Sequence, residues 1–144
     1  MKKAFLAIIL FVGVITTTGQ EPCDELGKLC KKYLEPNKNS TRFFISDGQV
    51  YRAFVDTDQE AEFYATFYGG STYRISTSAG SKDNYVIFEV KDTEGNVLFT
   101  NADFKNEPYW DFNIKSTLDV SISLKLDSDK KDSGCITMLI GFQQ

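Results

Sequence analysis

The chain of 144 residues carries 16 basic and 20 acidic side chains and no histidine, which gives a formal net charge of −4. This length predicts one domain, and a content of 42% hydrophobic and 25% charged residues is typical of a folded protein. The lack of histidine excludes Ser-His-Asp and Cys-His catalysis and histidine-ligated metal sites. The basic residues of the chain are scattered along the sequence. This disfavours nucleic acid and anionic lipid as partners, because binding to either begins with Lys and Arg near phosphates.

The N-terminus has the order of a secretory signal peptide. Two lysines after Met1 precede an unbroken apolar run from Ala4 to Ile15, and small and polar residues follow. We expect residues 1–19 to be removed by cleavage after Gly19. The run is too short for a membrane anchor, which needs about 20 residues. The sequence therefore predicts a secreted, periplasmic or cell-surface protein with no membrane insertion after signal removal.

Residues 20–40 are predicted to form one short amphipathic helix and a polar connector. Apolar residues recur at helical spacing between Asp24 and Glu35, with acids at the start and lysines near the end, and Pro36 stops the pattern. Residues 41–144 then show short alternating segments separated by turn signals. The nine predicted strands are Phe43–Ile45, Val50–Val55, Glu62–Tyr68, Thr72–Thr77, Tyr85–Lys91, Val97–Asn101, Tyr109–Ile114, Leu118–Leu126 and Cys135–Phe142.

These strands predict an all-β fold. The segment around Val120, Ile122 and Leu124 alternates apolar and polar side chains, which is the pattern of a sheet packed on one face only. About nine such strands in one domain are expected to form an antiparallel two-sheet sandwich, jelly-roll-like, with the helix covering an edge or end.

The three cysteines, Cys23, Cys30 and Cys135, all lie in the part that is predicted to be exported, where disulfides form. A straight helix would hold Cys23 and Cys30 about 10 Å apart, too far for a bridge between them. Cys30 shares the apolar stripe of the helix, so the first prediction is a Cys30–Cys135 disulfide, with Cys23 free or as the alternative partner. Three reduced cysteines are the competing interpretation.

Several segments of the predicted sandwich resemble a family of small, uncharacterised secreted bacterial β proteins. They include residues 47–54, 67–75, 96–101, Trp110-Asp111-Phe112 and 134–142. The order of strands and turns is also similar, more loosely, to the sandwiches found beside secreted peptidases (pre-peptidase C-terminal domains) and to GOLD-type sandwiches. This resemblance implies a binding or stabilising module rather than an enzyme.

Two acidic stretches are candidates for chemistry. Asp127, Asp129 and Asp132 offer carboxylates on one short segment, as a calcium site requires, although the spacing is not that of an EF-hand and lysines lie between them. A solvated hairpin loop is the alternative, and no other cofactor is predicted. Residues 56–60 with Glu62 contain acids that a carboxylate-only hydrolase would need, but a polar turn between two strands is the favoured interpretation.

Alternation places Tyr64 and Tyr68 opposite Phe63 and Phe67, and Tyr109 opposite Trp110. If one sheet face is open, Tyr64, Tyr68 and Tyr109 are predicted to form a ligand-binding platform; if both faces are covered, they belong to the core.

Three charged residues, Arg52, Arg74 and Asp111, interrupt strands that are otherwise apolar or aromatic. They either face water singly or form a pair between Asp111 and one of the arginines.

The sequence thus favours a secreted non-enzymatic binding module for a carbohydrate or a protein at the cell surface. An accessory subunit of a secreted or envelope complex is the alternative, and a carboxylate-only hydrolase is a remote one.

Overall fold

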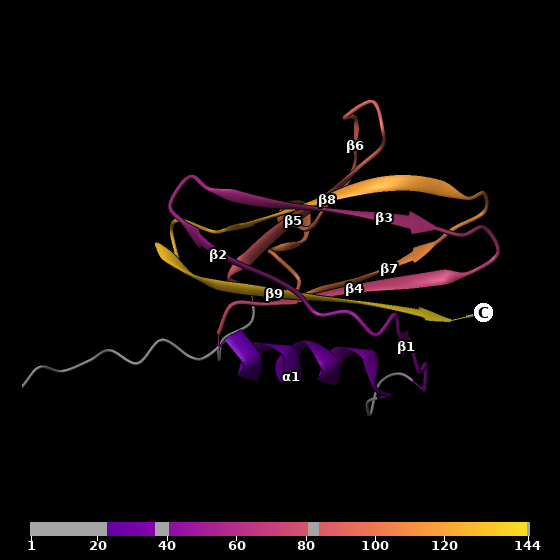
Figure 1. The fold of residues 1–144 in the computed structure, drawn as a ribbon, viewed down its shortest axis with the longest axis horizontal. Coiled ribbons are helices and arrows are strands. Elements are labelled where there is room, and N and C mark those ends of the chain that lie inside the picture. Colours follow the sequence, from indigo (N-terminus) through magenta and orange to yellow (C-terminus); the bar gives the residue numbers. More distant parts are fainter. Residues whose placement is uncertain (1–22, 37–40, 81–83, 144) are drawn as a thin grey trace, which may run out of the picture.

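The computed structural model describes residues 23–36, 41–80 and 84–143, so the predicted signal peptide lies outside the described residues. Figure 1 shows two stacked sheets with helix α1 (Cys23–Leu34) beneath the lower one. The lower sheet contains β1 (Ile45–Ser46), β2 (Tyr51–Asp56), β4 (Thr72–Ser78), β7 (Tyr109–Asn113) and β9 (Ser133–Gln143). The upper sheet contains β3 (Glu60–Phe67), β5 (Val86–Lys91), β6 (Val97–Thr100) and β8 (Leu118–Leu126).

All strand pairs are antiparallel. In the lower sheet β1 and β2 both pair with β9, and the order continues through β4 to β7. The upper sheet has the order β3, β8, β5, β6. The predicted all-β two-sheet sandwich with one short helix is therefore confirmed, while the jelly-roll connectivity stays a prediction.

The main core lies between the two sheets and follows the period of two along each strand. Val120, Ile122 and Leu124 on β8 face Ile136 and Met138 on β9 across the gap, and all five are buried. Aromatic rings fill the space toward the sheet edges, as in the stacked pair of Phe67 and Tyr73, whose centroids lie 4.5 Å apart.

Helix α1 covers the outer face of the lower sheet along β9 and β4 (Figure 1). A second small core forms there from Cys30, Leu34, Phe44 and Leu139. The end of the helix approaches β9 so closely that a Cβ atom on Gly141 would lie 2.9 Å from Leu34 Cδ2. Glycine at this position is therefore a condition for the helix to pack on the sheet.

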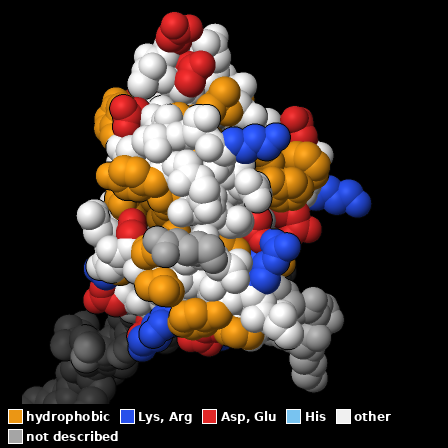
Figure 2. All heavy atoms as spheres, turned by 90° about the vertical axis from the view of Figure 1, so that its right-hand side faces the viewer, with side chains coloured by type: hydrophobic (Ala, Val, Ile, Leu, Met, Phe, Trp, Pro, Cys, Tyr) orange, Lys and Arg blue, Asp and Glu red, His pale blue; other side chains and the backbone are white. Residues whose placement is uncertain are grey.

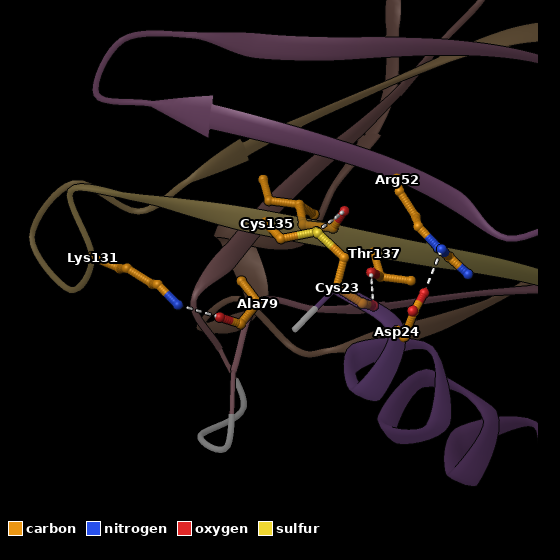
Figure 3. Close-up of a disulfide and its surroundings, with 8 residues drawn as sticks. Cys23, Asp24, Arg52, Ala79, Lys131, Cys135 and Thr137 are labelled. Atoms are coloured by element: carbon orange, nitrogen blue, oxygen red, sulfur yellow. Dashed lines mark hydrogen bonds and ion pairs between the residues drawn. A yellow bond between two sulfur atoms is a disulfide. The ribbon is translucent and has the colours of Figure 1, made fainter. Parts of the chain in front are cut away.

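A disulfide joins the start of α1 to β9, and the partner of Cys135 is Cys23 (Figure 3). The predicted Cys30–Cys135 bridge is wrong, because Cys30 is a free, buried thiol. The helix runs along β9 in the direction of that strand, so Cys30 reaches Thr137, whose carbonyl oxygen accepts its S–H at 3.3 Å. The apolar stripe indicated which side of the helix faces the sheet, but not how far along its axis each cysteine lies.

Arg74 holds the other end of the helix. Its Nε and Nη2 donate to both carboxylate oxygens of Asp111, at 2.6 and 2.8 Å, and its Nη1 donates to the Tyr33 carbonyl at 2.6 Å. The guanidinium lies between two rings, with its carbon 4.2 Å from the Phe44 centroid and 4.5 Å from the Tyr109 centroid. Of the two pairings considered for Asp111, the structure forms the one with Arg74. Arg52 pairs instead with Asp24 at the helix start (Figure 3).

Candidate functional site

Two of the three predicted tyrosines are exposed at β3: Tyr64 lies in the strand, and Tyr68 directly follows its last residue. Tyr64 is 74% exposed and Tyr68 is 61% exposed. Tyr64 stands on the outer face of the strand, opposite Ser121 of β8, and its hydroxyl donates to Glu62 at 2.9 Å. That hydrogen bond to a carboxylate raises the pKa of Tyr64. Both rings of this chain are therefore accessible to a binding partner.

The third tyrosine lies elsewhere, so the predicted three-residue platform is wrong. Tyr109 belongs to β7 in the other sheet, where it is half-buried on the face that the helix covers. Its ring stacks on Tyr33 with centroids 5.3 Å apart and also contacts Arg74. Alternation showed correctly that each tyrosine turns away from the main core, but it carries no information about which sheet a strand joins.

A hollow lies between the edges of the two sheets, beside β3. We call it the edge groove; its volume is about 480 Å³. It is lined by Asp47, Gln49, Tyr51, residues 64–68, Ser71, Tyr73, Ile140 and Phe142. The Tyr51 hydroxyl donates to Asp47 at 2.9 Å, and burial with this hydrogen bond raises the pKa of Tyr51 to about 12. Tyr51 therefore lines the groove as a neutral, polar side chain at physiological pH.

A second hollow, the face hollow, lies on the outer face of the upper sheet and has a volume of about 530 Å³. Ser121 contributes to its lining beside Tyr64, and the turn between β5 and β6 contributes Asp92, Thr93 and Gly95. The remaining lining residues are Glu62, Ala65, Thr66, Asp119 and Val120. Tyr64 lines both hollows, so one exposed ring separates two adjoining spaces.

The charged residues that line these two hollows are all acidic: Asp47, Glu62, Asp92 and Asp119. Their hydrogen-bond donors are neutral groups. Thr66 Oγ1 donates to Asp119 at 2.6 Å, and Asn96 Nδ2 donates to Asp92 at 2.8 Å. The Asn96 side chain and neighbouring backbone N–H groups lower the pKa of Asp92. Within the described ranges, no ion pair reaches any of the four.

Figure 2 views the end of the sandwich that lies at the right of Figure 1. Hydrophobic side chains reach the surface on both flanks of this end, and acidic side chains gather at the top, where Figure 1 places the β5–β6 hairpin. On this end of the molecule, the exposed hydrophobic side chains are thus divided among separate places rather than joined in one patch.

The predicted calcium ligands do not come together. Asp127 accepts hydrogen bonds from Lys130 Nζ at 2.9 Å and from Asn106 Nδ2 at 2.7 Å, and the Lys130 contact is the main cause of its lowered pKa. Asp129 and Asp132 lie in the same β8–β9 loop, but their carboxylates take no part in the hydrogen bonds around Asp127. In the part of the chain that the structure describes, no group of three or more Asp, Glu, Cys or His is arranged to hold a metal ion.

The other acidic stretch forms the turn from one sheet to the other. Asp56 ends β2, its carbonyl accepts from Gln59 N–H at 3.0 Å, and its own N–H donates to the Gln59 side chain. Glu60 and Glu62 then stand on β3, where Glu62 faces the outer surface with Tyr64. The polar-turn interpretation accounts for the placement of residues 56–59.

Two features escaped the sequence analysis. Asn101 is a fully buried amide: its Oδ1 accepts from Phe88 N–H at 2.8 Å, and its Nδ2 donates to the Val86 and Glu107 carbonyls. Near it, the rings of Phe104 and Trp110 lie 4.3 Å apart beside a hollow of about 700 Å³ on the flank opposite β3. In the sequence, the single tryptophan of the chain was the only feature that could have indicated this aromatic cluster.

The fold has a counterpart among solved structures. The crystal structure of Aeromonas hydrophila PliG, a periplasmic lysozyme inhibitor of g-type lysozyme, matches 69% of this chain and 88% of its own chain, with a TM-score of 0.53. The sequences are 9% identical, so this likeness concerns the fold alone. No family model and no curated protein matches the chain. The resemblance to peptidase-accessory and GOLD-type sandwiches is not confirmed.

Proposed function

We propose that this chain is an extracytoplasmic, non-enzymatic β-sandwich that binds a protein partner through the rim formed by Tyr64 and Tyr68. The observation that carries the proposal is the exposure of these two rings, at 74% and 61%, beside the edge groove. Tyrosine supplies a large contact area at low entropic cost and a hydroxyl for hydrogen bonding, which makes it frequent in binding surfaces.

The compartment is supported by two independent features. The N-terminal sequence has the order of a signal peptide, and Cys23 and Cys135 form a disulfide, which persists in oxidising environments. No helix in the described part of the chain has the length and apolar character that crossing a membrane requires. PliG, whose fold is similar, is a periplasmic protein.

The choice of a protein over a carbohydrate rests on the same neighbour. PliG is an inhibitor of a lysozyme, and so it is a case of this fold acting on a protein. The absence of histidine from the chain removes the commonest catalytic base and favours binding over catalysis.

The test compares proteins and glycans bound by the mature chain and by matched variants. Proteins from the exported fraction of the producing cells, with a g-type lysozyme included, are captured on the immobilised wild type, on Y64A/Y68A and on F54A, and identified by mass spectrometry. Phe54 is the control because it is 62% exposed on the other sheet. We expect at least one protein to be captured by the wild type and F54A but not by Y64A/Y68A.

Three outcomes would contradict the proposal. Capture that is equal for all three proteins would show that the tyrosine rim is not used. Specific binding on a glycan array, lost in Y64A/Y68A and with no tyrosine-dependent protein, would assign the rim to a carbohydrate instead. A partner that co-purifies at fixed stoichiometry regardless of these substitutions would favour the accessory subunit.

A further inference from the structure

Strand β3 leaves one edge of the upper sheet open. It pairs with β8 along its whole length, from Glu60 opposite Lys125 to Phe67 opposite Leu118. It is the terminal strand of its sheet, and on its other side the described residues supply no paired strand (Figure 1). Such an edge presents unpaired N–H and C=O groups to which another extended chain can add.

The space beside this edge suits the side chains of an added strand. Successive side chains of a strand point to opposite faces. A segment laid along β3 would direct one set toward the face hollow and the alternate set toward the edge groove, because Tyr64 borders both. The two hollows therefore occupy the positions that two sets of partner side chains would take.

The charge of the lining selects the partner. Asp47, Glu62, Asp92 and Asp119 line the hollows, no Lys or Arg does, and their hydrogen-bond donors are neutral. Two lysines stand on this face outside the lining: Lys91 is opposite Ser121 and pairs with Glu89 at 3.4 Å, and Lys125 is opposite Glu60. An exposed aromatic ring also attracts a cation to its face. A basic segment is thus complementary to the site in charge, whereas an acidic one would be repelled.

We propose that the free edge of β3 binds an extended segment of the partner that carries Lys or Arg. The segment adds to the upper sheet as a further strand. A basic side chain packs on the Tyr64 ring and approaches Glu62 and Asp119. This inference rests on the proposed function, to which it adds the chemistry of the partner segment.

The probes are three fluorescein-labelled ten-residue peptides in which threonine alternates with arginine, glutamine or glutamate. Their binding to the mature protein is followed by fluorescence anisotropy at low and at physiological salt. The charge test uses E62Q/D119N. Its control is D103N/E107Q, which removes the same charge from the flank opposite β3. We expect the arginine peptide alone to bind, and E62Q/D119N to weaken it by about tenfold, the loss expected of two partly exposed ion pairs. The control is expected to leave it unchanged.

A second probe tests the strand addition. Arginine peptides are N-methylated on alternate residues in one register or in the other. Methylation that faces β3 removes the donors to its edge, so we expect one of the two peptides to lose binding and the other to keep it.

Three results would overturn the inference: equal binding of the three peptides, equal weakening by the two double variants, or indifference to N-methylation in both registers. In each case protein capture that depends on Tyr64 and Tyr68 would leave the proposed function standing. Loss of that tyrosine dependence would remove the proposed function instead, so the two failures are distinguishable.

Discussion

The outer face of the lower sheet carries a helix, a disulfide and a partly buried ion pair, whereas the outer face of the upper sheet carries tyrosine and carboxylate side chains that meet solvent. Along the strands the two faces have similar polar residues: Arg74 and Ser76 on β4, and Asp119 and Ser121 on β8. Yet Arg74 and Ser76 are buried, while Asp119 is exposed. Polar alternation therefore marks a face that turns away from the main core, and it leaves open whether solvent or another element covers that face.

The two outer faces are also expected to serve different purposes, the covered face for stability and the exposed face for binding. The covered face satisfies its charges internally, since Asp111 pairs with Arg74 and a second arginine, Arg42, approaches within 3.6 Å. On the bare face, the carboxylates that line the face hollow accept hydrogen bonds from neutral donors, and the Tyr64 and Tyr68 rings are exposed. Substitutions on the first face are expected to lower the free energy of unfolding, and those on the second to change binding.

The largest expected effect is at Arg74. R74M removes the main partner of Asp111 and the Nη1 donor to the Tyr33 carbonyl, so we expect a loss of about 3–5 kcal/mol in the free energy of unfolding. The control is R52M, which removes the exposed pair with Asp24 on the same sheet face and is expected to cost about 0–1 kcal/mol. Urea denaturation measures both. Equal losses would show that the pair of Arg74 and Asp111 does not hold the helix.

The disulfide gives the next effect. Replacing Cys23 and Cys135 together by serine opens a loop with a sequence separation of 112, and we expect a loss of about 2–4 kcal/mol. Non-reducing digestion and mass spectrometry of the wild type should join the Cys23 and Cys135 peptides and leave Cys30 unlinked. A Cys30–Cys135 peptide would contradict the structure.

Alanine substitutions of the three tyrosines allow a direct comparison of the two faces. Y109A removes a ring that stacks on Tyr33 and contacts Arg74, so we expect a loss of about 2 kcal/mol. Y64A and Y68A remove exposed rings and are expected to cost less than about 0.5 kcal/mol each. Losses near 3 kcal/mol at all three positions in chemical denaturation would show that the rings are core and would remove the binding rim.

The smallest effect concerns pH at the covered face. Burial raises the pKa of the Cys30 thiol to about 12, above the value of about 8.5 in an unfolded chain. The protonated thiol therefore contributes stability that is complete below pH 8.5 and declines as the pH rises toward 12.

The alkaline decline should be shallower in C30A than in the wild type when unfolding is measured from pH 8 to 10. Iodoacetamide at pH 8.5 should modify Cys30 slowly in the folded protein and quickly in denaturant. Rapid modification of the folded protein would show that the thiol is accessible.

Much of the fold could be read from the order of the residues. The helix was expected between Asp24 and Glu35 and extends from Cys23 to Leu34, and every predicted strand has a counterpart within a few residues of its ends. These features depend on the local periods of side-chain direction, 3.6 for a helix and 2 for a strand, and on turn residues such as Gly48, whose φ is 85°. The exposure of Tyr64 and Tyr68 was foreseen only in part, since the same pattern also allowed a covered face.

The remaining features were decided by contacts between distant parts of the chain. Sheet membership separates Tyr64 from Tyr109, the position of the helix along β9 brings Cys23 and not Cys30 to Cys135, and the helix end buries Arg74. Periodicity is a property of a few consecutive residues, so the sequence alone determined which side chains turn inward within each element. Which strands become neighbours, and which outer face is covered, is fixed by packing that joins residues up to 114 positions apart, and only the tertiary structure decided it.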